Sequence, residues 1–341
     1  MIKLFLKRIV QFLFLPIMIT GVMSLLYLKA DPFLDFRKDN YSWKYFFQGL
    51  GDLATKKLID SNLKYNSFIF GSSVSANVYA CYLQNKIPES IFFHYADWGE
   101  TVEGVYNKMK FIDSSGYEIK NVFWFIDANR TFMYSGTDRI DNHYLLTGQK
   151  KRDYLIYHFK AYYKSIFNFN SYSKDRIKIL LGLPVEGEIF PNWNSDLFTN
   201  DTNHSCDTVN FENYAKIDSK TELKNKVDSL RNTGKFFHKR DTIQQYNEIQ
   251  IVEMKKELLL KIYDLFKKHN TNFYIVITPA YDQKKFDPLD YAILNSLFGD
   301  RLYDFSGIND FTNNDYNYYD GTHYQKYISK HIIDQIFSEN N

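Results

Sequence analysis

The sequence predicts an α/β fold built on a parallel sheet with helices on both faces. After residue 64, short and largely apolar runs alternate with amphipathic segments, which is the pattern of strands and helices that follow one another along a chain. Each right-handed crossover between parallel strands places its helix on a face of the sheet. With 341 residues, 45% of them hydrophobic, the chain is long enough to bury one large core and to carry an insertion.

Five strands are expected, at residues 67–70, 91–95, 121–127, 273–277 and 302–304. Helices are expected at residues 74–85, 101–113, 242–268, 289–298 and 324–337. Between residues 131 and 240 the alternation is lost, although 154–167 has a helical pattern. We interpret this part as a largely helical insertion in a domain that covers residues 65–337.

An uncharged run at residues 9–28 has the length that a helix needs to cross a membrane. A cleaved signal peptide is the alternative, but the run exceeds the usual apolar core of a signal peptide and no small-x-small site follows it. Lys3, Lys7 and Arg8 precede the run without an acidic residue, which favours a cytoplasmic tail at residues 1–8. We therefore expect a single-pass anchor, a juxtamembrane segment at 29–64 and an extracytoplasmic main domain.

Charge and cysteine content narrow the classes of function. The 42 basic and 40 acidic residues are interspersed and leave a net charge of +2, so no nucleic-acid partner is expected. Cys81 and Cys206 are the only cysteines, which excludes a disulfide scaffold and leaves a single bridge between them open. The eight histidines form no spaced metal cluster, and neither a metal nor a cofactor is expected.

Ser73 is the first candidate for a reactive side chain. It follows Gly71 and Ser72 at the turn between the first strand and the next helix, where a hydroxyl and backbone N–H groups point to the same edge of the sheet. The alternative is that both serines only cap the helix, as serine does routinely. We expect Ser72 to be the cap and Ser73 to be the nucleophile.

Asp320 and His323 are the second candidates. Their three-residue spacing lets one turn present a carboxylate beside an imidazole, so that the carboxylate fixes the tautomer of a histidine that acts as general base. For this tetrapeptide alone, a surface turn with a solvated histidine is the alternative. Because Ser73 follows a strand and the pair precedes the last helix, we expect all three to converge on one pocket.

Taken in order, these blocks resemble those of the SGNH, or GDSL-like, hydrolase superfamily. Phe70-Gly71-Ser72-Ser73 follows the first strand, Gly99 the second and Asn129 the third, and Asp320-x-x-His323 precedes the last helix. The resemblance covers about residues 65–130 and 245–337, and it extends to membrane-anchored members such as the D-alanine transfer proteins and the alginate-type O-acetyltransferases. It implies a three-layer, flavodoxin-like fold with a five-stranded parallel sheet.

The resemblance also implies a role for each matching residue. Ser73 would be the nucleophile, His323 the base and Asp320 its orienting acid. The oxyanion hole would consist of the N–H groups of Ser73 and Gly99 and the side chain of Asn129. The sequence departs from the family pattern at Ser72, which replaces an Asp, and around Asn129, where Asp127-Ala128-Asn129-Arg130 replaces Gly-x-Asn-Asp. Asn129 is therefore equally open to interpretation as a strand-end turn residue.

His94 and Asp97 also lie near the end of the second strand. We expect His94 to be a packed, hydrogen-bonded histidine and Asp97 to be a turn residue.

These expectations lead to acyl transfer through a seryl ester at the cell envelope. Water as acceptor would make the protein an esterase, and a hydroxyl of a polysaccharide or glycoconjugate would make it an O-acyltransferase. From the resemblance alone, a multispanning membrane acyltransferase is an expected partner. The altered third block favours a second hypothesis, a catalytically silent glycan-binding or assembly protein. A lipid-active esterase is a third hypothesis.

Overall fold

The computed structural model describes residues 2–37, 50–133, 143–168, 173–183 and 237–339, together with positions 185, 225, 228–229 and 232–233. The chain forms two compact units. The anchor unit contains Met1–Gln48 and Ile140–Asn194. The sheet unit contains Gly49–Arg139 and Ser195–Asn341.

The sheet unit is built on a five-stranded parallel sheet, as the sequence predicts. Its strands are β1 (Ser67–Gly71), β2 (Phe92–His94), β3 (Asn121–Ile126), β5 (Asn272–Ile277) and β7 (Leu302–Asp304). Their order is β2-β1-β3-β5-β7, and every neighbouring pair is parallel. The chain moves outward from β1 to β2 and then crosses back to β3, so the strand order reverses at β1. Ligands bind parallel α/β sheets at the carboxyl ends of the strands beside such a reversal.

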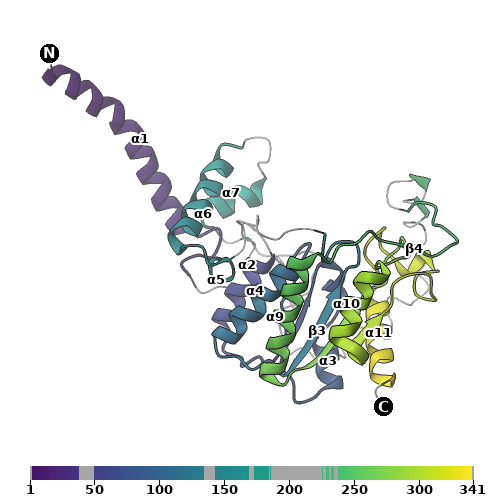
Figure 1. Cartoon of the computed structure of the whole chain (residues 1–341). Helices are drawn as coiled ribbons and strands as arrows, with labels where there is room; N and C mark the ends of the chain where they lie inside the picture. The colour runs from purple at the N-terminus through teal and green to yellow at the C-terminus, as the bar shows by residue number, and fades with distance from the viewer. Residues whose placement is uncertain are drawn as a thin grey trace. The chain divides into compact units, whose positions relative to one another are not determined.

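Helices cover both faces of this sheet (Figure 1). The helices described in the sheet unit are α2 (Leu50–Asp60), α3 (Ala80–Lys86), α4 (Val102–Ser114), α9 (Glu253–His269), α10 (Pro288–Phe298) and α11 (Lys326–Glu339). Successive residues of a strand point to opposite faces, and β3 illustrates this arrangement. Phe123 belongs to a core cluster that contains Ile332 of α11, whereas the ring of Trp124 contacts Phe298 of α10.

The helix expected at residues 74–85 is interrupted. Ser73–Asn77 form a 3-10 helix, the next two residues are extended, and α3 begins at Ala80. The Ser75 hydroxyl donates to the backbone oxygen of Ser72 at 2.8 Å, and the Ser75 N–H donates to the same oxygen at 2.9 Å. Such local side-chain bonds of serine compete with α-helical hydrogen bonds. The turn that carries Ser73 is therefore tighter than the sequence pattern indicates.

The helix expected at residues 242–268 also begins later, at Glu253. Before it, β4 (Gln245–Tyr246) pairs with β6 (Lys284–Lys285) in a small parallel ladder. The buried carboxylate of Asp290 accepts the N–H groups of Gln250 at 2.7 Å and of Ile251 at 3.1 Å. These bonds hold residues 250 and 251 outside the helix. Because Asp290 is distant from them in the sequence, the local pattern around residue 250 does not predict this break.

The anchor unit is helical where it is described. Its helices are α1 (Ile2–Ala30), α5 (Tyr144–Thr147), α6 (Lys151–Ile166) and α7 (Lys174–Leu180). α1 has 29 residues and is long and apolar enough to cross a membrane. Its last turns pack against α6 and α7 in a cluster that includes Met23, Tyr27, Tyr162 and Leu180.

Two predicted segments divide between the units. Residues 140–194 of the predicted insertion group with α1, whereas α2 of the predicted juxtamembrane segment belongs to the sheet unit. The reason is burial, because Ala54 and Leu58 of α2 are fully buried in the sheet unit and Tyr162 of α6 is fully buried in the anchor unit. Much of the insertion between residues 186 and 236 lies outside the described residues.

Candidate active site

The structure brings Ser73, His323 and Asp320 together. Ser73 opens the 3-10 helix that follows β1, and the other two lie in the turn before α11. His323 Nε2 is 2.9 Å from Ser73 Oγ, and His323 Nδ1 is 2.9 Å from the nearer carboxylate oxygen of Asp320. The serine and the histidine are separated by 250 residues in the sequence. The contact expected among the three side chains is therefore present.

The turn from Asp320 to His323 is shaped by its own hydrogen bonds. Asp320 Oδ1 accepts the backbone N–H groups of Thr322 at 2.8 Å and of His323 at 2.9 Å. On either side of the turn, Tyr318 and Tyr324 pair in an antiparallel bridge, and both are fully buried. The carboxylate is thus held in one orientation, with its two oxygens 3.0 and 2.9 Å from Nδ1 of the imidazole.

The same bonds explain the ionisation of Asp320. Partial burial opposes the charged form, but the hydrogen bonds from the His323 side chain, the His323 backbone and the Thr322 backbone outweigh it and lower the pKa of Asp320 to about 2. An ionised carboxylate accepts the proton on Nδ1 and leaves the lone pair of Nε2 facing the Ser73 hydroxyl. This arrangement can remove a proton from Ser73.

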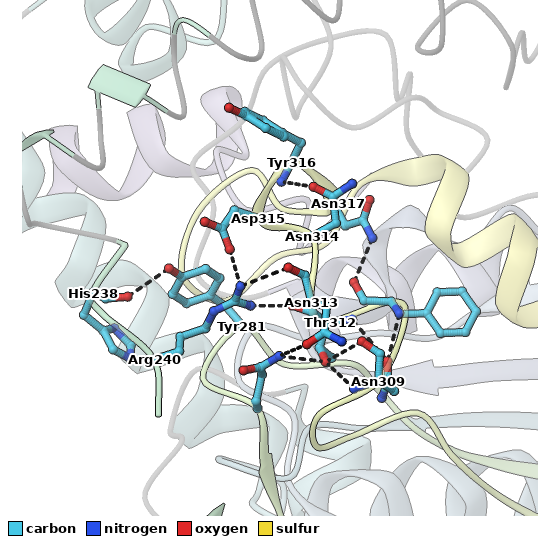
Figure 2. A network of polar contacts seen from close by, with 12 residues as sticks. His238, Arg240, Tyr281, Asn309, Thr312, Asn313, Asn314, Asp315, Tyr316 and Asn317 are labelled. Carbon is cyan, nitrogen blue, oxygen red and sulfur yellow. Dashed lines mark hydrogen bonds and ion pairs between the residues drawn. The ribbon is translucent and has the colours of Figure 1, made fainter. Parts of the chain in front are cut away.

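A polar network holds the loop at residues 309–317, which precedes this turn in the sequence (Figure 2). The guanidinium of Arg240 donates to the backbone oxygen of Thr312 and to the carboxylate of Asp315, and it lies over the ring of Tyr281 at 4.6 Å. Tyr281 in turn contacts the ring of Tyr318, with centroids 5.6 Å apart. Sequence reasoning missed Arg240, because these contacts depend on how residues 309–317 fold back and no periodic pattern encodes them.

Gly71 lets the turn that carries Ser73 approach its neighbours closely. A Cβ at this position would lie 2.7 Å from Ser75 Cβ and 2.9 Å from the backbone oxygen of Phe125, distances that a side chain does not tolerate. Ser72 is buried, and its hydroxyl accepts the N–H of Val74 at 3.5 Å. The expectation that Ser72 is the helix cap is confirmed.

A second serine–histidine contact lies two residues beyond Ser73. Ser75 Oγ is 3.0 Å from Nε2 of His94, and both residues are buried. The Ser75 hydroxyl can donate its proton to the Ser72 carbonyl and accept one from Nε2 of His94 when that nitrogen carries the proton. Among the described residues, no hydrogen-bond partner faces Nδ1 of His94. His94 is a packed, hydrogen-bonded residue, as expected, and it contacts Ser75, two residues after Ser73.

Replacing His94 by Gln is expected to reduce the loss of stability in acid. Burial, followed by the charge of Lys108, lowers the pKa of His94 to about 3, whereas a histidine in an unfolded chain titrates near about 6.5. Between these values the unfolded chain takes up a proton that the folded chain does not, so stability falls with decreasing pH by up to about 1.4 kcal/mol per unit. Above about pH 6.5 this contribution is complete and constant.

Thermal unfolding midpoints at about pH 4.5 and about pH 7.5 measure this effect. The difference between the two midpoints should be smaller in the His94→Gln protein than in the wild type. His331→Gln, on α11, is the control for loss of a histidine elsewhere. The same difference in the wild type and in His94→Gln would contradict the prediction.

Gly99 and Asn129 are the expected oxyanion donors. Gly99 lies in the turn after β2 with a φ of 56°. The N–H of Asp97 in the same segment donates to the backbone oxygen of Gly71, at 3.2 Å, beside the turn that carries Ser73. Asp97 is a buried turn residue, since its carboxylate accepts the N–H of Trp98 at 2.7 Å. The structure therefore puts the Gly99 turn beside the turn that carries Ser73.

Asn129 lies in the turn after β3, and its side chain already has partners. Its Nδ2 donates to the carboxylate of Asp282 at 3.1 Å, and its Oδ1 accepts from Asn247 at 3.1 Å. Its backbone N–H donates to Asp127, whose pKa is raised because the carboxyl is buried. Both interpretations of Asn129 fit these contacts, because one proton of the amide remains for a second acceptor.

Within the described residues, no group of three or more His, Cys, Asp or Glu side chains could hold a metal ion. Cys81 lies in α3 and is disulfide-bonded. Cys206, which the sequence offers as a partner, lies outside the described residues.

Comparison of the chain with known protein families gave no match, and comparison with curated proteins also gave none. The functional assignment of this site therefore depends on its residues and their geometry.

Proposed function

We propose that the chain is a membrane-anchored enzyme of the SGNH type that transfers acyl groups through a seryl ester. The observation that carries the proposal is the chain of contacts from Ser73 through His323 to Asp320, with both hydrogen bonds at 2.9 Å. The strand order of the sheet supports it, since counting its strands along the chain gives the flavodoxin-like order 2-1-3-4-5. The three residues also lie at the edge where such sheets bind ligands.

The geometry suggests the following chemistry. As Ser73 Oγ attacks the carbonyl carbon of an acyl donor, its proton moves to Nε2 of His323, and the carbonyl oxygen becomes an oxyanion. When the intermediate collapses, the bond to the leaving oxygen breaks and His323 returns the proton to that oxygen. Water or a sugar hydroxyl then attacks the acyl-Ser73 ester by the same steps, and Ser73 regains its proton. Asp320 stays ionised throughout and stabilises the charged imidazole.

The acceptor and location follow from the anchor and from the family resemblance. α1 is long and apolar enough to hold the protein at a membrane, and the charges that precede it favour an extracytoplasmic main domain. A polysaccharide or glycoconjugate of the cell envelope is the proposed acceptor, with a multispanning membrane acyltransferase as the proposed supplier of acyl groups.

A fluorophosphonate probe tests the proposal on the full chain in detergent. Such probes phosphonylate a serine that is activated by a general base. We expect one adduct per chain, mapped by peptide mass spectrometry to Ser73. An adduct on Ser75, or no adduct at all, would contradict the assignment.

A catalytically silent glycan-binding or assembly protein is the second candidate, and the surroundings of Asn129 favour it. The Asn129 amide is bonded to the carboxylate of Asp282. Negative charge near an oxyanion hole opposes the charge that develops in the transition state. This candidate predicts folded protein that binds glycan without turnover.

Asn129→Ala distinguishes a donor from a turn residue. If the amide donates to the oxyanion, the substitution should lower kcat by roughly 10²- to 10³-fold with little change in KM. Asp282→Asn is the matched control, because it removes a neighbouring charge and leaves the Asn129 amide in place. A lower melting temperature with unchanged kcat would assign Asn129 to the turn alone. Both values come from ester hydrolysis assays and thermal unfolding of the same preparations.

A further inference from the structure

The last turns of α1 are covered, in contrast to the rest of the helix. Met23, Tyr27 and Ala30 are buried, and these residues recur on one side of the helix. Their cover comes from α6 and α7, through Tyr162 and Leu180. Gly182, just after α7, approaches the end of α1 so closely that a Cβ there would lie 2.7 Å from Ala30 Cα. Toward the N-terminus, α1 exposes large apolar side chains such as Phe12, Leu15 and Ile17.

This packing sets the depth of α6 and α7 relative to a bilayer. The uncharged run of α1 ends at residue 28, so Met23 lies about 7.5 Å before that end along the helix axis. Residues that cover Met23 and Tyr27 must therefore lie at the level where the hydrocarbon core meets the headgroups. α6 and α7 cannot lie in bulk water far from the bilayer if α1 spans it.

The connection between α1 and α6 is specific as well as apolar. The carboxylate of Asp35 accepts the hydroxyl proton of Tyr27 at 2.6 Å and is 2.8 Å from Nδ1 of His158 on α6. The side chains of Asp35 and His158 are fully buried. These bonds fix α6 on the end of α1, since breaking a buried polar pair leaves uncompensated groups.

The side of α6 that faces away from α1 is apolar in part. Tyr154, His158 and Tyr162 form the buried side, and the opposite side carries three large apolar side chains that are about half exposed. These are Ile156 at 43%, Tyr163 at 41% and Phe167 at 51%. A helix at the surface of a soluble protein is normally polar on the face opposite its buried stripe. The contacts of the described residues leave this second apolar stripe about half exposed.

Basic residues accompany the exposed apolar side chains. α6 and α7 together contain seven basic and two acidic residues, and Lys160 and Lys164 lie beside the exposed stripe of α6. Leu181 and Leu183, after α7, add two more exposed apolar side chains at 45% and 48%. Lysine together with aromatic and aliphatic side chains is the composition of helices that lie in the headgroup layer and bind anionic lipid.

We infer that α6, α7 and residues 181–183 form an interfacial collar around the end of the anchor that binds the headgroup layer of anionic phospholipids. The inference depends on the proposed membrane span of α1 and is independent of the acyl-transfer chemistry. The exposed apolar side chains enter the headgroup boundary, and the lysines contact lipid phosphates. The collar thereby adds a peripheral contact to a single transmembrane helix.

A fluorescent depth measurement on the full chain tests the collar. Tyr163→Cys is labelled with bimane and placed in nanodiscs of phosphatidylcholine, with or without an equal share of phosphatidylglycerol. A lipid that carries a doxyl quencher near its headgroup should quench this label, and more strongly in the anionic discs. A label at Val22→Cys, on an exposed face of α1, reports on the span itself, and unsubstituted protein is the blank for labelling of native cysteines.

Charge reversal tests the lipid preference. Lys160→Glu with Lys164→Glu should weaken the binding of the collar to anionic discs. The attraction of one lysine to an anionic surface corresponds to roughly five-fold in binding, so each reversed charge should weaken the contact by about that factor. Lys261→Glu with Lys284→Glu, two exposed lysines of the sheet unit, makes the same change of charge and should leave the quenching as it was. Circular dichroism verifies that each variant is folded.

Each outcome has one meaning. Quenching at residue 22 but not at residue 163 would overturn the collar while leaving the span intact. No quenching at either position would overturn the span and the collar together. Equal quenching in both lipid mixtures would overturn the preference for anionic lipid. None of these results bears on labelling of Ser73 by a fluorophosphonate, so the enzymatic proposal is tested separately.

Discussion

Replacing Ser73 by Ala is expected to lower the kcat of ester hydrolysis by roughly 10⁶-fold, as removal of a nucleophile does in enzymes that form acyl-serine intermediates. The substitution removes the only atom that contacts Nε2 of His323 at hydrogen-bond distance among the described residues. The oxyanion donors would remain, but no covalent intermediate could form. Hydrolysis of p-nitrophenyl acetate and incorporation of a fluorophosphonate measure the two consequences, and both should disappear.

Ser72→Ala is the matched control, since it removes a hydroxyl from the adjacent residue. Ser72 is buried and accepts only one long bond from Val74 among the described residues, so its loss should cost stability at the level of a helix cap, about 1 kcal/mol. Its kcat should stay within a few-fold of the wild type. Equal activity in the wild type and in Ser73→Ala would refute the enzyme hypothesis and leave the silent glycan-binding protein as the remaining candidate.

Asp320→Asn is expected to lower kcat by roughly 10⁴-fold while the protein stays folded. The asparagine amide can donate to Nδ1 of His323, which selects the tautomer with a proton on Nε2, and this tautomer cannot accept the Ser73 proton. Because the carboxylate of Asp320 has a pKa of about 2, it is ionised throughout the neutral range, and the wild type carries the productive tautomer there. Steady-state kinetics at neutral pH measure the loss.

Asp334→Asn is the matched control, because it removes a hydrogen-bonded carboxylate that does not contact His323. It therefore separates the effect on the tautomer of His323 from the general effect of losing such a carboxylate. Burial opposes ionisation of Asp334, but bonds from Lys86, Tyr82 and Lys330 outweigh it and lower its pKa to about 2, as for Asp320. This cluster contains neither Ser73 nor His323. Comparable kcat losses in the two variants would show that Asp320 has no special role. Loss in Asp320→Asn alone would support the proposed triad.

The fold class was accessible from the sequence because the strands are short, apolar and buried. The runs at 121–127, 273–277 and 302–304 became β3, β5 and β7 with almost unchanged ends. A fully buried strand must be apolar along its whole length, and that requirement is visible in a local window. Helices with an apolar stripe, such as α4 with its buried Val102, Val105, Met109 and Ile112, were predictable for the same reason.

The incorrect helix boundaries have a different origin. Residues 250 and 251 are held outside α9 by Asp290, and the break before α3 depends on bonds between Ser75 and Ser72. In both places a polar side chain satisfies backbone groups that a helix would otherwise satisfy. The hydrophobic periodicity of a sequence does not show which polar partner a backbone group bonds to. These helix boundaries could therefore be determined only from the structure.

The sequence by itself determined the parallel sheet, the apolar helix at the N-terminus and the three residues of the candidate triad, because each is encoded in a short stretch of chain. Only the tertiary structure decided that a second serine–histidine pair lies beside the predicted one. Ser73 contacts His323 across 250 residues, while Ser75, two positions on, contacts His94 instead. It also decided that α6 and α7 pack on the end of α1. Hydrogen bonds act over about 3 Å, so these pairings depend on the three-dimensional arrangement of segments that are distant in the sequence.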